Sequence, residues 1–397
     1  MKFSARDRLK LLAGASALAL TGCGGSNSSS APISGSTPSP APPPPPPPPT
    51  GGIEPGLLKN SFDNNFTFGT AMANTRLSPV DQSATIALDQ FSSITPEYEL
   101  KLNNIAPTAG VLDFDAANRV VDWALGNGMQ VRGHALVWHE ATPDYFLQGS
   151  RTDIQARLED YIANVIGEFR DRISIWDVAN EVVSVDIYSG NSGIGPDRRT
   201  SWFDAVGNAD YLDWAFRAAR AADPNAQLFL SDYQTEDPLK QDWLLEILRR
   251  LIDRGVPIDG VGHQFHIRLD TAVDAMLGAI DAVEDEFPNF VNHITEMDMN
   301  FYQDPGTCWE SQTNCQPDIG PTPPADQIAQ QAQMLRDIFN GFVLRPSIEN
   351  VSFWGVRDSD SWLNFVPVER YNYPLLFDRD GNPKPCLHAI TDPNYEI

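Results

Sequence analysis

Positive charge is scarce in this chain. Lys and Arg number 28 against 53 Asp and Glu among 397 residues, which gives a formal net charge of −25. A surface this acidic repels phosphate groups, so we do not expect nucleic acid or anionic lipid as a partner. The net charge does not exclude an uncharged substrate, because the electric field of the protein does not steer a neutral molecule.

Several chemical signatures are missing as well. The chain has no Gly-x-Ser-x-Gly elbow, which argues against a Ser–His–Asp hydrolase. The segment Phe68-Gly69-Thr70-Ala71 lacks the spacing of a phosphate-binding loop. The 4 Cys and 6 His have no metal-binding spacing, so the chain predicts neither a metal site nor a cofactor.

No apolar run has the length of a membrane span. Residues 1–23 combine a basic start with an apolar core, Leu11–Leu20, which is too short to cross a bilayer as a helix. The string Leu20-Thr21-Gly22-Cys23 is typical of a bacterial lipobox and predicts a lipidated Cys23; an ordinary cleaved export signal is the alternative. We expect an exported protein, lipid-anchored to a bacterial membrane on the periplasmic or surface side of the outer membrane, or else secreted.

Residues 24–56 predict a linker, because Gly, Ser and Pro dominate them. Pro42–Pro49 is a run of eight prolines, which forms polyproline II at about 3.1 Å per residue and makes a stiff spacer of roughly 25 Å. Export permits disulfides. Cys308 and Cys315 stand in a loop rich in Pro, Gly, Asn and Gln, and we expect them to pair. Cys386 is left over and is predicted to be a buried thiol.

Residues 57–397 predict one folded domain in which short apolar segments alternate with helical ones. Buried parallel strands have this appearance, because they lack the alternation of half-exposed strands. The predicted strands are Phe66–Met72, Phe91–Thr95, Gln130–Trp138, Ile173–Ala179, Gln227–Ser231, Gly260–Phe265, His293–Met297 and Val351–Gly355. Between them, apolar stripes such as Leu158–Phe169 and Leu244–Ile252 have helical spacing.

Eight strands that alternate with helices predict an α/β fold, a (β/α)8 TIM barrel, with a doubly wound open sheet as the alternative. A barrel places functional side chains at the C-terminal ends of its strands. Polar and aromatic residues stand at those ends: Glu97, His134, Trp138, Asn180, Glu181, Asp232, Gln264, His266, Glu296 and Trp354. Core packing alone gives no reason for such a cluster.

Two of the carboxylic acids among these residues, Glu181 and Glu296, stand in motifs at the ends of apolar runs. Glu181 ends Ile-Trp-Asp-Val-Ala-Asn-Glu, and Glu296 stands in His-Ile-Thr-Glu-Met-Asp. Hydrolysis of a glycosidic bond needs one carboxyl that protonates the leaving oxygen and a second that faces the anomeric carbon as an anion. The pair therefore predicts a glycoside hydrolase.

Four motifs resemble glycoside hydrolase family 10, which consists mainly of endo-β-1,4-xylanases. They are Arg132-Gly133-His134-Ala135-Leu136-Val137-Trp138-His139, Trp176-Asp177-Val178-Ala179-Asn180-Glu181, Ile294-Thr295-Glu296-Met297-Asp298, and Phe353-Trp354-Gly355-Val356-Arg357-Asp358-Ser359-Asp360-Ser361-Trp362. The resemblance runs from about residue 60 to the C-terminus and keeps the order of the family. It implies a retaining enzyme, without metal or cofactor, that acts on β-1,4-xylan or xylo-oligosaccharides. We expect a monomer.

The resemblance also implies roles for individual residues. Glu181 matches the general acid/base and Glu296 the nucleophile. Asn180 matches a residue that binds the sugar 2-hydroxyl, Gln264 one that touches the acid/base, and His266 one that donates to the nucleophile and is oriented by Asp298. Substrate positioning falls to Glu97, Tyr98, Lys101, His134, Trp138, Trp354 and Trp362.

One departure concerns the glycone side. The family usually has Glu-Asn-x-x-Lys-Trp where this chain has Glu97-Tyr98-Glu99-Leu100-Lys101-Leu102. Tyr98 is larger than Asn and offers a single hydroxyl. An exo-acting or oligosaccharide-preferring relative, similar to a β-xylosidase or a glucanase, is therefore the first alternative to an endo-xylanase. A non-catalytic glycan-binding protein is the second, although it has no need of Glu181, Glu296, His266 and Asp298 together.

Overall fold

The computed structural model describes residues 53–184 and 195–397. The predicted leader, Cys23 and the linker as far as residue 52 lie outside the described residues. Within the described part of the chain, no helix is both long and apolar enough to cross a bilayer.

Parallel strands form the centre of the domain. They are β1 (Thr67–Met72), β2 (Ser93–Pro96), β3 (Gln130–Gly133), β4 (Ile175–Asn180), β5 (Gln227–Asp232), β6 (Gly260–His263), β7 (His266–Arg268), β8 (Val291–Asn300) and β9 (Ile348–Phe353). The sheet runs in the order β6-β5-β4-β3-β2-β1-β9-β8-β7, and a further pairing of β6 with β8 closes the circle. The result is an eight-stranded barrel in which β7 is a short extra strand beside β8. The predicted barrel is confirmed, and an open doubly wound sheet is excluded.

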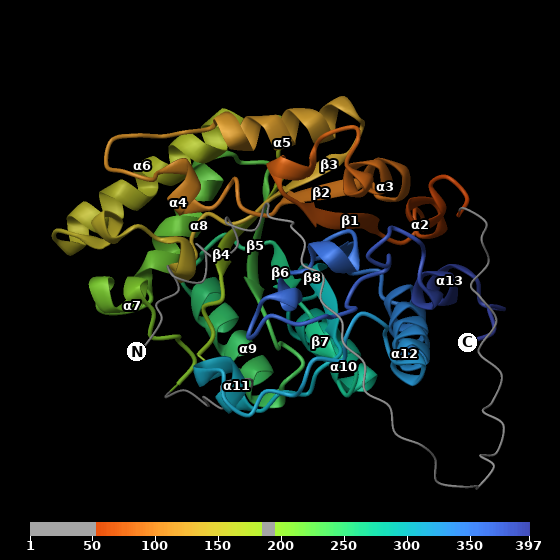
Figure 1. Cartoon of the computed structure of the whole chain (residues 1–397). Coiled ribbons are helices and arrows are strands. Elements are labelled where there is room, and N and C mark those ends of the chain that lie inside the picture. Colours follow the sequence, from red (N-terminus) through yellow and green to blue (C-terminus); the bar gives the residue numbers. More distant parts are fainter. Residues whose placement is uncertain (1–52, 185–194) are drawn as a thin grey trace, which may run out of the picture. The chain divides into compact units, whose positions relative to one another are not determined.

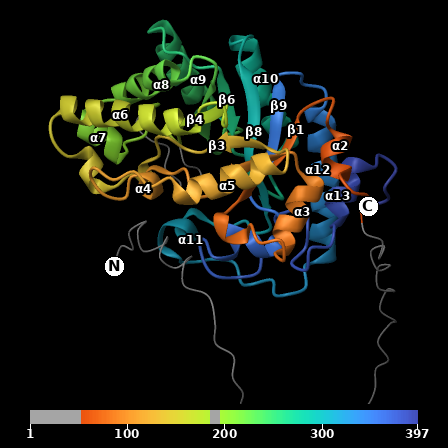
Figure 2. The same ribbon diagram turned by 90° about the horizontal axis from the view of Figure 1, so that it is seen from above.

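Helices surround the strands (Figures 1 and 2). They are α2 (Leu57–Ser61), α3 (Gln82–Gln90), α4 (Leu102–Ile105), α5 (Asp115–Gly126), α6 (Arg151–Phe169), α7 (Ser201–Val206), α8 (Asp210–Ala222), α9 (Pro238–Asp253), α10 (Val273–Glu286), α11 (Gly306–Ser311), α12 (Ala325–Phe342) and α13 (Pro385–Thr391). The apolar stripes predicted for α6 and α9 face the core: Leu158, Ile162 and Leu248 are fully buried. A capping box at Ser150 and Asp153 starts α6, because both groups satisfy free N–H donors of the first turn.

Strand β3 is shorter than the sequence predicts. The expected strand ran to Trp138, but the regular ladder ends at Gly133, and Val137 pairs with Ala179 only as an isolated bridge. The chain leaves the ladder at His134, where the side chain turns to contact Asp177 and Glu296. The irregular segment therefore belongs to the site and not to the barrel wall.

The barrel interior is tightly packed, and part of it is polar. A Cβ atom on Gly133 would lie 2.2 Å from the Trp176 ring, so only glycine fits there. Arg132 forms a buried, two-pronged ion pair with Asp177 and stacks on Phe229, with its guanidinium carbon 4.8 Å from the ring centre. This pair lies below His134 and supports it.

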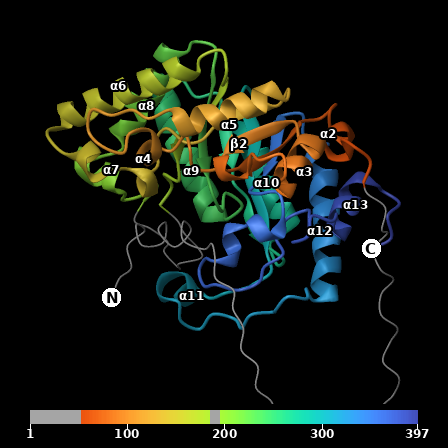
Figure 3. The same ribbon diagram turned by 45° about the horizontal axis from the view of Figure 1, so that its top comes forward.

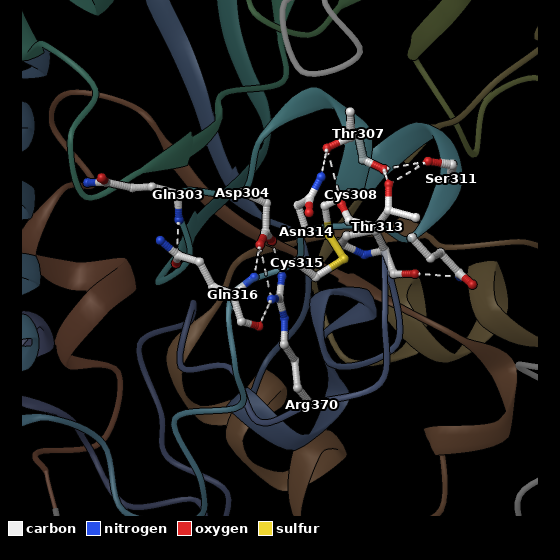
Figure 4. The surroundings of a disulfide bond; sticks show 12 residues. Gln303, Asp304, Thr307, Cys308, Ser311, Thr313, Asn314, Cys315, Gln316 and Arg370 are labelled. Carbon is white, nitrogen blue, oxygen red and sulfur yellow. Dashed lines mark hydrogen bonds and ion pairs between the residues drawn. A yellow bond between two sulfur atoms is a disulfide. The ribbon is translucent and has the colours of Figure 1, made fainter.

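The connection from β8 to α12 contains a disulfide and the short helix α11. Cys308 and Cys315 form the predicted disulfide, and Cys386 is a buried thiol, as expected. Figure 3 shows α11 set apart from the long helices. In Figure 4 the chain after the disulfide contacts Arg370, which pairs with Asp304 and donates to the Gln316 carbonyl at 3.0 Å.

Candidate active site

Glu181 follows β4 directly, and its backbone is unusual. Its φ of +57° lies in the left-handed region, which a residue with a Cβ rarely adopts, and such strain gathers at functional sites. The backbone N–H of Glu181 donates to the Ser231 carbonyl at 2.9 Å, which ties the residue to β5. The strained conformation is thus held in place by the neighbouring strand.

Amide and guanidinium groups surround the Glu181 carboxyl. Its Oε1 accepts from Asn180 Nδ2 at 3.4 Å and from Gln264 Nε2 at 3.5 Å, and Gln264 also donates to Asn180 Oδ1 at 3.1 Å. Its Oε2 lies 3.4 Å from Arg198 Nη1. Glu181 therefore has donors on both oxygens, and its side chain is 16% exposed.

Glu296 stands inside β8 and is more deeply buried, with 7% of its side chain exposed. His266 Nε2 lies 3.3 Å from its Oε2, and His134 Nδ1 lies 3.8 Å from its Oε1. Within the described part of the chain, Oε1 accepts no hydrogen bond. One carboxylate oxygen is thus held by a histidine, while the other remains available.

The histidine that holds Glu296 is itself oriented by an acid. His266 Nδ1 lies 3.0 Å from Asp298 Oδ2, which also accepts from Trp362 Nε1 at 2.8 Å. Burial alone would lower the pKa of His266, but the charges of Asp298 and Glu296 outweigh it and raise the pKa to about 10. His266 is therefore an imidazolium at neutral pH.

One segment contacts both carboxyls. Gln264 reaches Glu181 and His266 reaches Glu296, with only Phe265 between them. Phe265 has a φ of +49°, which separates β6 from β7 and lets the two flanking side chains turn to different acids. One short segment therefore contacts both the acid that follows β4 and the acid within β8.

His134 belongs to the same site from the other side of the barrel. Its Nδ1 lies 3.0 Å from Asp177 Oδ2. Burial alone would raise the pKa of Asp177, but Arg132 and His134 outweigh it, so the pKa lies below its usual value. An ionised Asp177 fixes the orientation of the His134 ring beneath Glu296.

Lys101 and three aromatic rings line the remaining side of the site. Lys101 Nζ lies 4.6 Å from the Trp138 ring centre, 5.7 Å from Trp354 and 5.3 Å from Tyr98. Burial lowers the pKa of Lys101. The negative charges of Glu296, Glu97 and Glu181 oppose that shift, because these acids lie near the Lys101 ammonium and stabilise it.

The departure at Tyr98 has a direct consequence for Glu97. The Tyr98 hydroxyl donates to Glu97 Oε1, so one of the two carboxylate oxygens is already occupied. Burial is the main cause that raises the pKa of Glu97. Tyr98 therefore reshapes this wall by its bulk and also by its hydrogen bond.

The two tryptophans expected in the cleft contact the histidines. Trp354 meets His134 edge to face at 5.2 Å, and Trp362 meets His266 in the same way at 5.3 Å. All the residues predicted for the site gather at the C-terminal end of the barrel. In the described residues, no group of three or more His, Cys, Asp or Glu side chains could hold a metal ion.

The sequence reasoning missed three residues near the site. Arg198 contacts Glu181 from the segment before α7, Trp309 on α11 lies 6.2 Å from Trp362, and burial raises the pKa of Glu236 after β5 to about 7. None of them stands in a motif or at a predicted strand end. Only tertiary contacts reveal them.

Known proteins are similar to this chain in sequence and in architecture. Residues 57–393 match the family described as glycosyl hydrolase family 10. A β-1,4-xylanase from Dictyoglomus thermophilum is 36% identical over 348 residues, which cover 85% of this chain and 91% of that protein. Endo-1,4-β-xylanase B from Paenibacillus barcinonensis is 33% identical over 345 residues, covering 84% and 97% of the two chains.

A solved xylanase structure also has the fold of this chain. The crystal structure of xylanase B from Clostridium stercorarium F9 superposes with a TM-score of 0.77 at 34% identity, over 85% of this chain and 99% of that one. The family match over residues 57–393 includes both Glu181 and Glu296. With the barrel, the paired acids and this match along nearly all of the folded domain, the chain belongs to glycosyl hydrolase family 10.

Proposed function

We propose that this chain is a retaining endo-β-1,4-xylanase, which hydrolyses internal xylosidic bonds of xylan. The observation that carries the proposal is the pair of acids, Glu181 with donors at both oxygens and Glu296 held by an imidazolium. The names of the relatives, β-1,4-xylanase and endo-1,4-β-xylanase B, supply the substrate.

In the first step Glu296 is the nucleophile. Its Oε1 attacks the anomeric carbon and forms a glycosyl ester, while the bond to the leaving oxygen breaks and Glu181 gives that oxygen its proton. His266, protonated because its pKa is raised to about 10, donates to Oε2 and keeps the carboxylate oriented. Asp298 holds His266 in that orientation.

In the second step the roles of Glu181 reverse. Glu181, now a carboxylate, takes a proton from water as the water oxygen attacks the anomeric carbon, and the ester bond to Glu296 breaks. Two inversions at one carbon retain its configuration. In this proposal Asn180, which contacts Glu181, binds the 2-hydroxyl of the sugar, a contact that tightens in the transition state.

Substrate positioning falls to the residues around the two acids. Glu97, Lys101 and His134 offer hydrogen bonds to sugar hydroxyls, while Trp138, Trp354 and Trp362 offer flat apolar surfaces that match pyranose faces. Tyr98 tunes the glycone side. We also propose that the protein is exported, tethered through Cys23 and monomeric.

A time course of products from unsubstituted xylan, glucuronoxylan and short β-1,4-xylo-oligosaccharides tests the function. Mid-length oligomers should appear early, with retained anomeric configuration. Release of monosaccharide alone from the start would favour the exo-acting alternative, for which the Tyr98–Glu97 hydrogen bond is the structural reason. No action on any of these substrates would refute a xylanase.

A further inference from the structure

A second concave region lies beside the catalytic site. It has a volume of about 450 Å³, within the range of small-ligand sites. Its walls come from the chain after β8, at Asp318, and from the chain after β9, at Asn364 and Tyr371. Asn364 closes the short helical turn that begins at Trp362, so the hollow adjoins the catalytic cleft without sharing its acids. We call it the β8–β9 hollow.

Two exposed aromatic rings line the β8–β9 hollow. Few large hydrophobic side chains of the described residues are exposed, and the aromatic ones among them are Phe365, with an exposed fraction of 44%, and Tyr371, with 36%. Both belong to this single hollow. The hollow therefore offers two flat apolar surfaces within a lining that is otherwise polar, a combination that suits the faces and hydroxyl groups of a sugar.

The walls of the hollow are built before any ligand arrives. Arg370 forms an almost fully buried ion pair with Asp304 and donates to the Gln316 carbonyl, two residues that flank the loop closed by the disulfide (Figure 4). Arg379 donates to Asn364 and stacks on the Tyr371 ring, with its guanidinium carbon 4.6 Å from the ring centre. Fixed walls reduce the conformational entropy that binding must remove.

The charges in the hollow favour a neutral ligand. Two cations, Arg370 and Arg379, line it together with two anions, Asp318 and Glu369, so their formal charges cancel. Arg370 is already paired with Asp304 and Arg379 with Asn364. Asp318 Oδ1 already accepts from the backbone N–H groups of Gly320 and Tyr371, so its Oδ2 and the exposed carboxylate of Glu369 are the acceptors for ligand hydroxyl groups, and both repel an acidic ligand.

We propose that the β8–β9 hollow is a second carbohydrate-binding site, which holds pyranose units of an uncharged polysaccharide on Phe365 and Tyr371. Stacked sugar faces cover the two rings, and ring hydroxyls donate to Asp318 and Glu369. The site binds one stretch of a polymer while the catalytic cleft acts on another. The choice of a β-1,4-linked xylan as ligand rests on the proposed function; the site itself does not.

The double variant Phe365→Ala/Tyr371→Ala tests the site in the full-length protein. Affinity electrophoresis through gels that contain soluble xylan, in a Glu296→Ala background, should show binding weakened about tenfold, since two stacking contacts are lost. In the active enzyme, kcat/KM on xylotetraose should stay within about twofold, because a short substrate occupies only the cleft. Leu344→Ala, exposed and outside the hollow, is the matched control.

Several outcomes would overturn the site. Unchanged retention on xylan excludes it, and an equal loss on xylotetraose would mean that the rings merely support Trp362. Binding that needs glucuronic acid side groups would contradict the neutral ligand. If the double variant does not fold, the single variant Phe365→Ala decides, with Phe365→Trp expected to retain binding.

The same gels separate this proposal from the xylanase assignment. Mixed-linked β-glucan and mannan are run beside xylan. Retention on one of these other polymers that the double variant loses would support the site even if xylan proves not to be the substrate. Retention on none of the three would exclude the site.

Discussion

At the residue scale, the two acids differ in their neighbours. Glu181 is surrounded by amides and by Arg198, whereas Glu296 faces an imidazolium that Asp298 keeps protonated. Glu296 is the more deeply buried acid, and within the described residues its Oε1 accepts no hydrogen bond, which suits it to attack; Glu181 has donors on both oxygens and is more exposed, which suits it to exchange a proton with a leaving group and with water. Three predictions concern Glu296, Glu181 and His266 in turn.

Glu296→Ala removes the nucleophile and should lower kcat on xylan by more than about 10⁴-fold, because no ester intermediate can form. Binding of xylo-oligosaccharides, measured by calorimetry, should persist, since the sugar contacts remain. Turnover near that of the wild type would show that another group attacks the anomeric carbon.

Glu181→Ala removes the proton donor and should lower kcat/KM on xylo-oligosaccharides by about 10²–10⁴-fold. Aryl xylobiosides whose phenol is a good leaving group need little protonation, so formation of the glycosyl ester on them should suffer far less. Rates of aryl release and of oligosaccharide cleavage are compared. Equal losses on both substrates would argue against Glu181 as the acid.

His266 should make stability depend on pH. Its raised pKa means that the imidazolium stabilises the fold fully below about pH 6.5, its unfolded pKa, and that this contribution is lost as the pH rises through about 10. Denaturant unfolding of wild type and His266→Gln at a series of pH values should show a stability difference that shrinks across this window.

His388→Gln is the control for that measurement. Burial lowers the pKa of His388 in the fold, so His388 finishes titrating in the folded and unfolded states near the start of the window, and its effect should stay constant above about pH 7.5. A stability difference for His266→Gln that does not vary between pH 6.5 and 10 would contradict the assigned charge.

At the scale of elements, the site depends on where strands end. The β3 ladder stops at Gly133, β4 ends beside Glu181, and Phe265 separates β6 from β7. Gly133 packs against the Trp176 ring of the next strand and precedes His134 in the chain. Close packing between β3 and β4 therefore sets the position of a side chain at the nucleophile.

Gly133→Ala should destabilise the domain by about 1–3 kcal/mol, because the new Cβ would overlap the Trp176 ring and force the strands apart. Activity should fall too, since His134 is the next residue. Gly167→Ala, exposed on α6 with no atom near its added Cβ, is the control and should be neutral or stabilising by up to about 1 kcal/mol. Urea unfolding measures both; equal stabilities would refute the packing argument.

At the scale of the whole molecule, the acidic catalytic domain is predicted to stand at the end of a proline-rich spacer. A net charge of −25 repels an anionic membrane, so we do not expect surface attraction to hold the protein there. Lipidation at Cys23 is the proposed anchor instead, and acyl chains in sufficient number anchor stably.

Cys23→Ala should release the protein from membranes without changing its specific activity on soluble substrates, because the change is remote from the barrel in sequence. Detergent-phase partition and incorporation of labelled fatty acid measure the anchor. Release of the wild type into the aqueous phase would instead favour the ordinary cleaved signal.

Much of the fold was predictable because local patterns and barrel geometry agree. Parallel buried strands are recognisable as short apolar runs, and the polar residues after them identify the end of the barrel that carries the site. Strand limits were less predictable: the expected β3 included Trp138, and β7 was missed. A three-residue strand, His266–Arg268, has no pattern of its own and forms only because β8 offers a partner.

The amino-acid sequence by itself determined the barrel and the family and singled out Glu181 and Glu296 as the proposed catalytic acids, because these depend on local periodicity and on short contiguous motifs. Tertiary structure alone decided which groups surround those acids: Arg198 beside Glu181, Trp309 beside Trp362, and the Tyr98 hydroxyl on Glu97. The tertiary structure also forms the β8–β9 hollow, because the residues that line it come from separate segments of the chain. Contacts of this kind depend on how loops fold back over the barrel, and no local spacing records them.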